Sequence, residues 1–177
     1  SDVDGDHTNT WIADRKGRRV GIIDTDGNRQ SMAYDPNGNL VSVTDREGRI
    51  TVHAYDTRGR RTRTVTPDGA DITYGYDDHD RVTTVVTADG GIVTYDYPND
   101  LERNPSRITD PGGGVTELDW AAGLLRRVED PEGVVVRFDY DAHGELIATR
   151  NADGAVAKLV RDATGRVTQA ITPLGAI

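Results

Sequence analysis

The sequence predicts an all-β fold in the form of a repetitive antiparallel β-hairpin ribbon, and three observations predict it. A tyrosine or tryptophan returns about every 21 residues along the 177-residue chain. Glycines recur in two columns between these aromatic residues. Short β-rich runs separate the glycine columns. A fixed period of this size is typical of an array in which one supersecondary unit is stacked many times.

The recurring aromatic residue, called the anchor below, sets the frame of the repeat. Successive anchors are separated by 21, 21, 21, 23 and 20 residues. Extending this frame outward places Ala13 and Arg161 in the same column. We therefore expect about eight repeats over residues 13–177, preceded by a partial unit or flanking strand over residues 1–12. The anchors are Tyr34, Tyr55, Tyr76, Tyr97, Trp120 and Tyr140.

Each repeat contains two strand-like segments. In the repeat that begins at Tyr34, these segments are Leu40–Thr44 and Arg49–Ala54, and turn residues bound both of them. Strands that alternate with turns at intervals of about ten residues favour an all-β fold. Gly and Pro interrupt every longer stretch that has helical periodicity, so no helix is expected.

Two glycine columns mark the two turns of each repeat. Glycine permits a positive φ without a clash of Cβ, as tight hairpin turns require. Asp80 and Leu101 replace the glycine of the first column, and Gly123 sits one place early. The first column contains Gly17, Gly38, Gly59, Gly144 and Gly165, and the second contains Gly27, Gly48, Gly69, Gly90, Gly133 and Gly154.

The strand that leads into each anchor alternates in polarity. Because side chains two residues apart share a face of a strand, the residue two places before the anchor lies on the anchor's face. Six of the seven residues in that column are apolar or aromatic, which predicts one buried face and one solvent face. These seven residues are Met32, His53, Tyr74, Tyr95, Leu118, Phe138 and Leu159.

Residues 97–107 depart from the repeat. This segment contains Pro98 and Pro105, which cannot donate hydrogen bonds to a strand ladder. We expect a longer, exposed loop here, with a bulge or bend in the sheet.

Composition limits the classes of partner. The chain has a formal net charge of -9 and a pI near 4.8, and its arginines are scattered singly, so nucleic acid is not an expected partner. It has no cysteine, which excludes disulfides and cysteine-based zinc sites. Its apolar runs are too short to span a membrane.

The motifs that carry chemistry are missing or explained by turns. His53 and His143 fall in different repeats without a partner histidine at ligand spacing, which favours structural roles. The segments 2–6 and 24–28 are rich in Asp but lack the glycine and glutamate positions of an EF-hand. No nucleophile elbow, phosphate loop or dinucleotide fingerprint is present. We therefore expect a protein that is not an enzyme and binds no cofactor or metal.

Two tryptophans are the candidates for ligand binding. Exposed indole rings stack on sugar rings in carbohydrate-binding proteins, so Trp11 and Trp120 are candidate glycan contacts. Trp120 also occupies the anchor column, where packing against neighbouring strands explains it without a ligand.

The in-register motif Tyr-Asp-x-x-Gly-[Arg/Asn]-[Leu/Val] resembles the YD repeats of the Rhs family. It occurs at Tyr34–Leu40, at Tyr55–Arg60 and at Tyr140–Leu146, and the resemblance extends from about residue 13 to residue 177. The resemblance implies a long β-ribbon that spirals into a hollow shell. In bacterial polymorphic toxins and the C components of insecticidal toxin complexes, such shells enclose a toxic domain. In teneurins, a similar extracellular shell takes part in cell adhesion.

The resemblance leads to two functional hypotheses. The first is a structural, non-catalytic segment of a secreted or surface-located shell, with the remainder of the shell and an enclosed effector domain as partners. The alternative is an extracellular adhesion module that recognises glycan or protein, with residues 97–107, Trp11 and Trp120 as the candidate contacts. Because both ends fall inside a repeat, we expect the chain to be a segment of a longer array.

Overall fold

The computed structural model describes residues 9–162, 164–172 and 175–176, and every regular element in them is a β-strand. The all-β prediction is therefore confirmed. The chain divides into two compact units, residues 1–90 and 91–177, which are described separately. The described residues include no helix long and apolar enough to cross a membrane.

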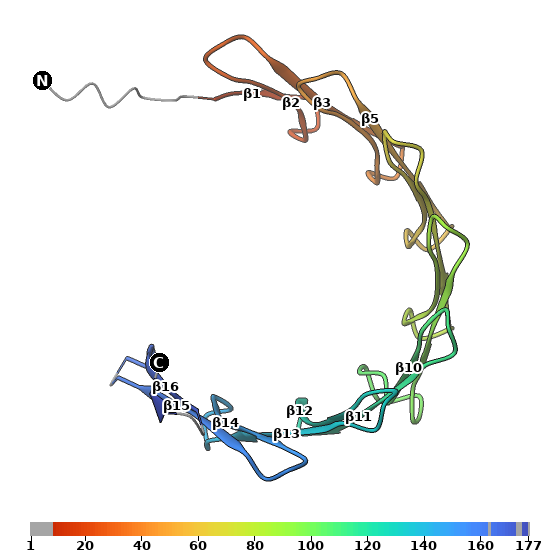
Figure 1. Cartoon of the computed structure of the whole chain (residues 1–177). Helices are drawn as coiled ribbons and strands as arrows, with labels where there is room; N and C mark the ends of the chain where they lie inside the picture. Colours follow the sequence, from red (N-terminus) through yellow and green to blue (C-terminus); the bar gives the residue numbers. More distant parts are fainter. Residues whose placement is uncertain (1–8, 163, 173–174, 177) are drawn as a thin grey trace, which may run out of the picture. The chain divides into compact units, whose positions relative to one another are not determined.

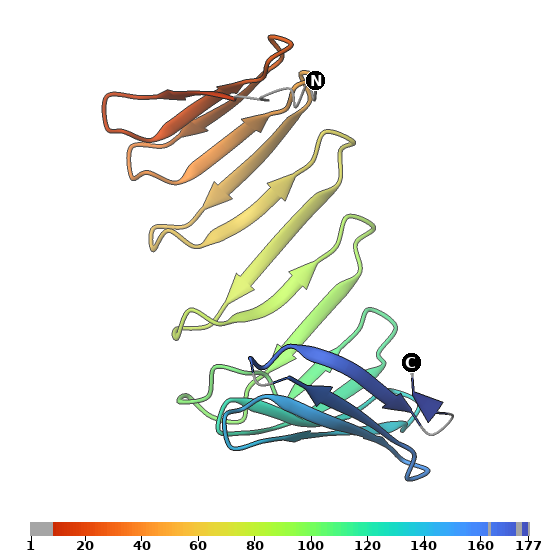
Figure 2. The ribbon, with the colours of Figure 1, turned by 90° about the vertical axis from the view of Figure 1, so that its left-hand side faces the viewer.

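The first unit is an antiparallel meander in which each strand pairs with the next strand along the chain (Figure 1). Its strands lie side by side in the order of the sequence (Figure 2). They are β1 (Thr10–Ala13), β2 (Arg19–Ile23), β3 (Arg29–Tyr34), β4 (Leu40–Thr44), β5 (Ile50–Tyr55), β6 (Arg61–Val65), β7 (Asp71–Tyr76) and β8 (Val82–Val86).

The second unit repeats this meander, with a wide loop between its first two strands. Leu101, at the tip of this loop, is 90% exposed. The strands are β9 (Ile92–Asp96), β10 (Arg107–Thr109), β11 (Val115–Ala121), β12 (Leu124–Glu129), β13 (Val135–Tyr140), β14 (Leu146–Asn151), β15 (Val156–Arg161), β16 (Val167–Thr172) and β17 (Gly175–Ala176).

One turn geometry joins most of these strands. In the turn after β3, the N–H of Gly38 donates to the carbonyl of Asp35 at 3.1 Å, and the N–H of Asp35 donates to the carbonyl of Asn39 at 2.9 Å. Gly38 has a φ of +95°, and the pairing register shifts between Ala33 and Tyr34. A type I turn followed by a left-handed residue and a bulge is a common hairpin connection. The second turn of the repeat, from Asp45 to Arg49, has the same two backbone hydrogen bonds.

The expected buried face is not found, although exposure alternates along β5 as the sequence predicts. Within each unit, strands contact only their neighbours in the chain, so the sheet is one layer thick. Ala148 and Thr64 are 5% and 8% exposed, and no described side chain is less than 2% exposed. Ile50 and Val52 lie opposite the anchor face of β5 and are 51% and 47% exposed. A single layer leaves both faces partly in contact with water, because none of the described strands packs on them.

Candidate functional site

The turn aspartate organises each hairpin end. In the turn after β5, Oδ1 of Asp56 accepts the backbone N–H groups of Arg58 and Arg60, both at 2.9 Å. Its Oδ2 accepts Nε of Arg60 at 2.7 Å. The backbone hydrogen bond from Arg60 is the largest of the effects that lower the pKa of Asp56. The same pattern of acceptors recurs in other turns, at Asp14, Asp45, Asp77 and Asp162.

The arginine that follows the turn glycine joins one repeat to the next. Nη1 of Arg60 donates to the backbone carbonyl of Asp77 in the next repeat at 2.8 Å and to Oδ1 of Asp80 at 3.0 Å. Its guanidinium lies over the ring of Tyr76, 4.8 Å from the centroid. Arg18 has the same relation to the ring of Tyr34, again at 4.8 Å. The side chain of Arg60 thus contacts the aspartate of its own turn, the ring of Tyr76 and the turn that follows Tyr76.

The polar tip of the anchor forms a hydrogen bond with the backbone across the sheet. The hydroxyls of Tyr34, Tyr55 and Tyr76 donate to carbonyls fifteen residues earlier in the chain, at 2.9, 2.9 and 2.7 Å. Nε1 of Trp120 donates to the carbonyl of Pro105 over the same separation, at 2.9 Å. Half-buried tyrosine and tryptophan combine an apolar ring with a donor, which explains why these residues recur here. Sequence reasoning missed this role, although the absence of Phe and Leu from the anchors was a signal for it.

Arg161 takes the place of an aromatic anchor by a different chemistry. Its Nη2 donates to the carbonyl of Leu146 at 3.2 Å, again fifteen residues back, and lies 3.4 Å from the carboxylate of Glu145. Glu145 occupies the position that Arg18 and Arg60 hold in their turns. The usual pair of arginine and aromatic ring is therefore replaced by a pair of glutamate and arginine.

We expect the substitutions Glu145→Arg and Arg161→Tyr to be coupled. Alone, the first sets two cations side by side, and the second leaves Glu145 without its partner. Together they restore the arrangement of Arg60 and Tyr76. Contacting residues show interaction energies of about 0.5–3 kcal/mol. We expect the free energy of unfolding of the double variant to be about 1 kcal/mol higher than the sum of the two single effects predicts. Urea unfolding of all four proteins measures this, and additive effects would contradict the pairing.

The glycine of the first turn provides a second test of the local geometry. Gly59 has a φ of +79°, so Gly59→Val places a β-branched residue in the left-handed region. This strain costs about 1–2 kcal/mol. Thr57→Val changes a neighbouring turn position and should have a smaller effect. Thermal unfolding should therefore give a lower Tm for the Gly59 variant, and equal Tm values would mean that the turn register is wrong.

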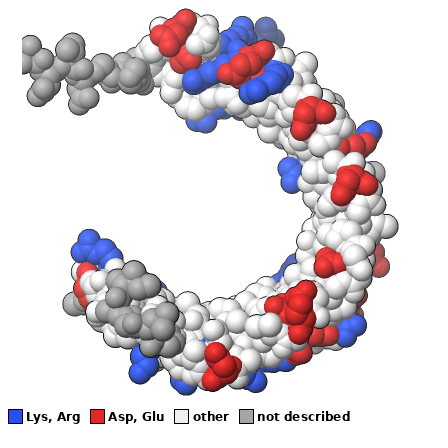
Figure 3. All heavy atoms as spheres, viewed as in Figure 1, with Lys and Arg blue, Asp and Glu red and all other residues white. Residues whose placement is uncertain are grey.

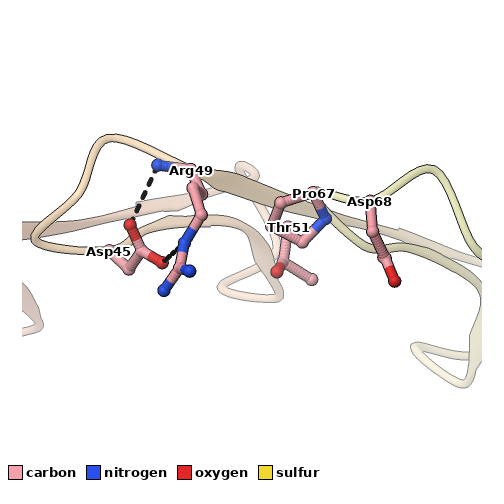
Figure 4. A pocket seen from close by; sticks show the side chains of 5 residues that line it. All are labelled: Asp45, Arg49, Thr51, Pro67 and Asp68. Carbon is pink, nitrogen blue, oxygen red and sulfur yellow. Dashed lines mark hydrogen bonds and ion pairs between the residues drawn. The ribbon is translucent and has the colours of Figure 1, made fainter.

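Surface depressions lie between successive turns. The one drawn in Figure 4 has a volume of about 550 Å³ and is lined by Asp45, Arg49, Thr51, Pro67 and Asp68. Asp45 is bound to Arg49, and Asp68 lies apart from both and accepts the hydroxyl of Thr66. Each of the two carboxylates is thus held by its own turn.

The two histidines have local partners. Nδ1 of His53 lies 3.1 Å from the hydroxyl of Thr64, and partial burial, with a contribution from Arg61, lowers its pKa. His143 sits in a turn, where its backbone N–H donates to Asp141 at 2.8 Å. No cluster of three potential metal-ligating side chains occurs in the described part of the chain.

Of the two Asp-rich segments, only segment 24–28 lies among the described residues. Segment 2–6 lies outside the described residues. In segment 24–28, Oδ1 of Asp24 accepts the N–H groups of Asp26 and Asn28 at 3.0 and 2.9 Å. Its Oδ2 is bound to the side chain of Asn28, and Arg46 of the next repeat approaches to 3.2 Å. Asp24 therefore caps its turn like the other turn aspartates.

The two tryptophans have different surroundings. Trp11 is 50% exposed, and the guanidinium of Arg19 lies 3.1 Å from its ring centroid. Trp120 lines a depression of about 350 Å³ beside the loop after β9, together with Asn99, Glu102 and Asp119.

Charged groups of both signs are interspersed along the visible surface of each unit (Figure 3).

Fold and joints together define a repeat protein built from antiparallel hairpins, and comparison with known proteins identifies its family. A family model described as RHS Repeat matches residues 34–71, 55–92, 76–115, 119–156 and 140–177. The chain belongs to this family. No match was found among curated protein sequences.

Solved structures with a similar fold come from toxin complexes. The chain is 14% identical to a chain of the Photorhabdus luminescens Tc holotoxin pore, with a TM-score of 0.56, and 93% of it is covered. It is 15% identical to a chain of the TcdB2-TccC3 crystal structure, with a TM-score of 0.52 and the same coverage. It spans 12% of each of those chains. At these identities, the likeness establishes the fold alone.

Proposed function

We propose that this chain is a structural, non-catalytic wall segment of a hollow β-shell that encloses or displays an effector domain. One observation carries the proposal: Arg60 links its own hairpin to the equivalent hairpin of the next repeat through Tyr76 and Asp77. Arg18 makes the corresponding contacts with Tyr34 and with the carbonyl of Asp35. Such a joint extends a sheet one repeat at a time and needs no second layer. The toxin-complex origin of the similar structures supports the role of container.

The wall segment pairs with further repeats of its shell, and the shell encloses a toxin or effector domain. We infer secretion or display at the surface of a bacterium. The net charge of -9 argues against nucleic acid as a partner. The joint occupies the turn carboxylates in structural hydrogen bonds, which supports a non-catalytic role.

Protease protection of the full-length protein tests this proposal. We expect the domain that follows the repeats to resist trypsin in the native protein. Replacing Tyr55 and Tyr76 together with alanine should open the wall and expose that domain to rapid cleavage. Arg63→Gln is the control, since it removes a surface arginine that takes no part in the joints. Equal cleavage rates in native and double-variant proteins would contradict the proposal.

One observation supports a second candidate function, recognition of glycan or protein. The depression at Trp120 combines an indole ring with the amides of Asn99 and Asn104 and the carboxylate of Glu102, a lining suited to sugar hydroxyls. Glycan-array binding that disappears in Asn99→Ala and Asn104→Ala variants of unchanged Tm would favour this function. The site would be rejected if binding survived the two asparagine substitutions, deletion of the loop over residues 97–107 and replacement of Trp11.

A further inference from the structure

A row of arginines crosses one face of the second unit. Strand register places Asp119, Arg127, Arg137 and Arg150 directly opposite one another on β11, β12, β13 and β14. Directly opposed residues of antiparallel strands point to the same side, with Cβ atoms about 4.5–5.5 Å apart. This face is the one opposite Leu118, Val128, Val136 and Phe138.

The outer arginines of the row are neutralised and the central one is not. Arg127 is paired with Glu129 and, at 3.4 Å, with Asp119. Nε of Arg150 lies 2.6 Å from Asp139. Arg137 is exposed and forms no ion pair within the part of the chain that the structure describes. The carboxylates nearest to it on this face, Glu129 and Asp139, are those already bound by its two neighbours.

A second cation lies beside this row, in a shallow depression. Lys158 is directly opposite Ala148 on β14 and therefore diagonal to Arg150. It is exposed and, like Arg137, has no acidic partner among the described residues. The depression has a volume of about 450 Å³, and Ile171 also lines it. Ala148, only 5% exposed, also lines it and provides an apolar floor.

Keeping three guanidinium groups in line has a cost, because like charges directly opposed on a sheet are destabilising. A carboxylate seated on Arg137 would remove this repulsion through a bidentate pair. We propose that this face binds an extended acidic segment of another polypeptide. One of its carboxylates pairs with Arg137, a second pairs with Lys158, and a small apolar side chain enters the depression at Ala148. Binding at this surface does not require the chain to be part of a shell.

Fluorescence anisotropy with a labelled peptide of alternating Glu and Ala tests this binding. We expect Arg137→Gln and Lys158→Gln each to weaken the affinity about tenfold, the effect of losing one hydrogen-bonded charge pair. Arg63→Gln is the matched control: Arg63 has a side chain 54% exposed and is paired with Asp71, and its loss should leave the affinity unchanged. Arg137→Gln should also keep or raise the Tm, because it relieves repulsion and removes no structural contact.

Four results would overturn the inference. The first is no binding of the acidic peptide by the native chain. The second is an affinity that neither Arg137→Gln nor Lys158→Gln changes. The third is tighter binding of polyphosphate than of the peptide, since a surface made for phosphate would then be the better description. A fall in the Tm of Arg137→Gln would likewise make Arg137 a structural residue.

Discussion

Replacing Tyr76 with alanine should lower the free energy of unfolding by about 3 kcal/mol. Loss of the half-buried ring accounts for about 2 kcal/mol, on the scale of apolar side-chain burial. The hydroxyl adds about 1 kcal/mol through its 2.7 Å hydrogen bond to the carbonyl of Arg61. Removal of the ring also frees Arg60 from its stacked position, which weakens the link to the next turn.

Tyr76→Phe separates the two contributions. This variant keeps the ring beneath Arg60 and removes only the donor, so it should lower the free energy of unfolding by about 1 kcal/mol. Urea unfolding followed by circular dichroism measures both variants. If phenylalanine and alanine were equally destabilising, the hydroxyl alone would hold the joint. If neither changed stability, the anchor would not be a joint.

Acid should unfold the chain as the turn aspartates become protonated. Partial desolvation opposes the ionisation of Asp77, but hydrogen bonds from the backbone and side chain of Arg81 outweigh it and lower its pKa to about 2. Its usual value is 3.8, so the ionised group stabilises the folded chain above about pH 4. This contribution is lost as the pH falls through about 2. The pKa is lowered in the same direction at Asp14, Asp24, Asp35, Asp45, Asp56, Asp68, Asp71, Asp141 and Asp162.

Thermal melts between pH 7 and pH 2 check this prediction. The Tm should fall most steeply below pH 4, and Asp77→Asn should lower the Tm at pH 7 and flatten the fall. Asp26→Asn is the control, because the carboxylate of Asp26 accepts no hydrogen bond from the described residues. His53, with a lowered pKa, adds a loss of stability below its usual value of 6.5. A Tm independent of pH down to 2 would contradict the role assigned to the turn carboxylates.

Periodicity was enough to predict the fold class and the strands. The expected strand Leu40–Thr44 coincides with β4. The expected strand Arg49–Ala54 begins one residue too early, because the carbonyl of Arg49 closes the preceding turn by accepting the N–H of Asp45. Such a boundary depends on hydrogen bonding and cannot be read from side-chain polarity.

The joints and the arginine row depend on register, which the sequence does not display. A hydroxyl that reaches a carbonyl fifteen residues back is visible only once the bulge before Tyr55 has set the pairing. Likewise, Arg127, Arg137 and Arg150 stand 10 and 13 residues apart in the chain. Nothing in those unequal spacings shows that two intervening turns bring them into line. The expectation of one buried face was wrong because alternating polarity along a strand does not show whether anything covers the less polar face.

The most direct test of the wall proposal is a cryo-electron microscopy map of the full-length protein that contains this chain. We predict that residues 10–172 form part of a curved wall one sheet thick, with strands of further repeats hydrogen-bonded on both sides and density for another domain inside. A map in which this segment stands apart from any enclosed space, or in which the repeats surround no lumen, would contradict the proposal.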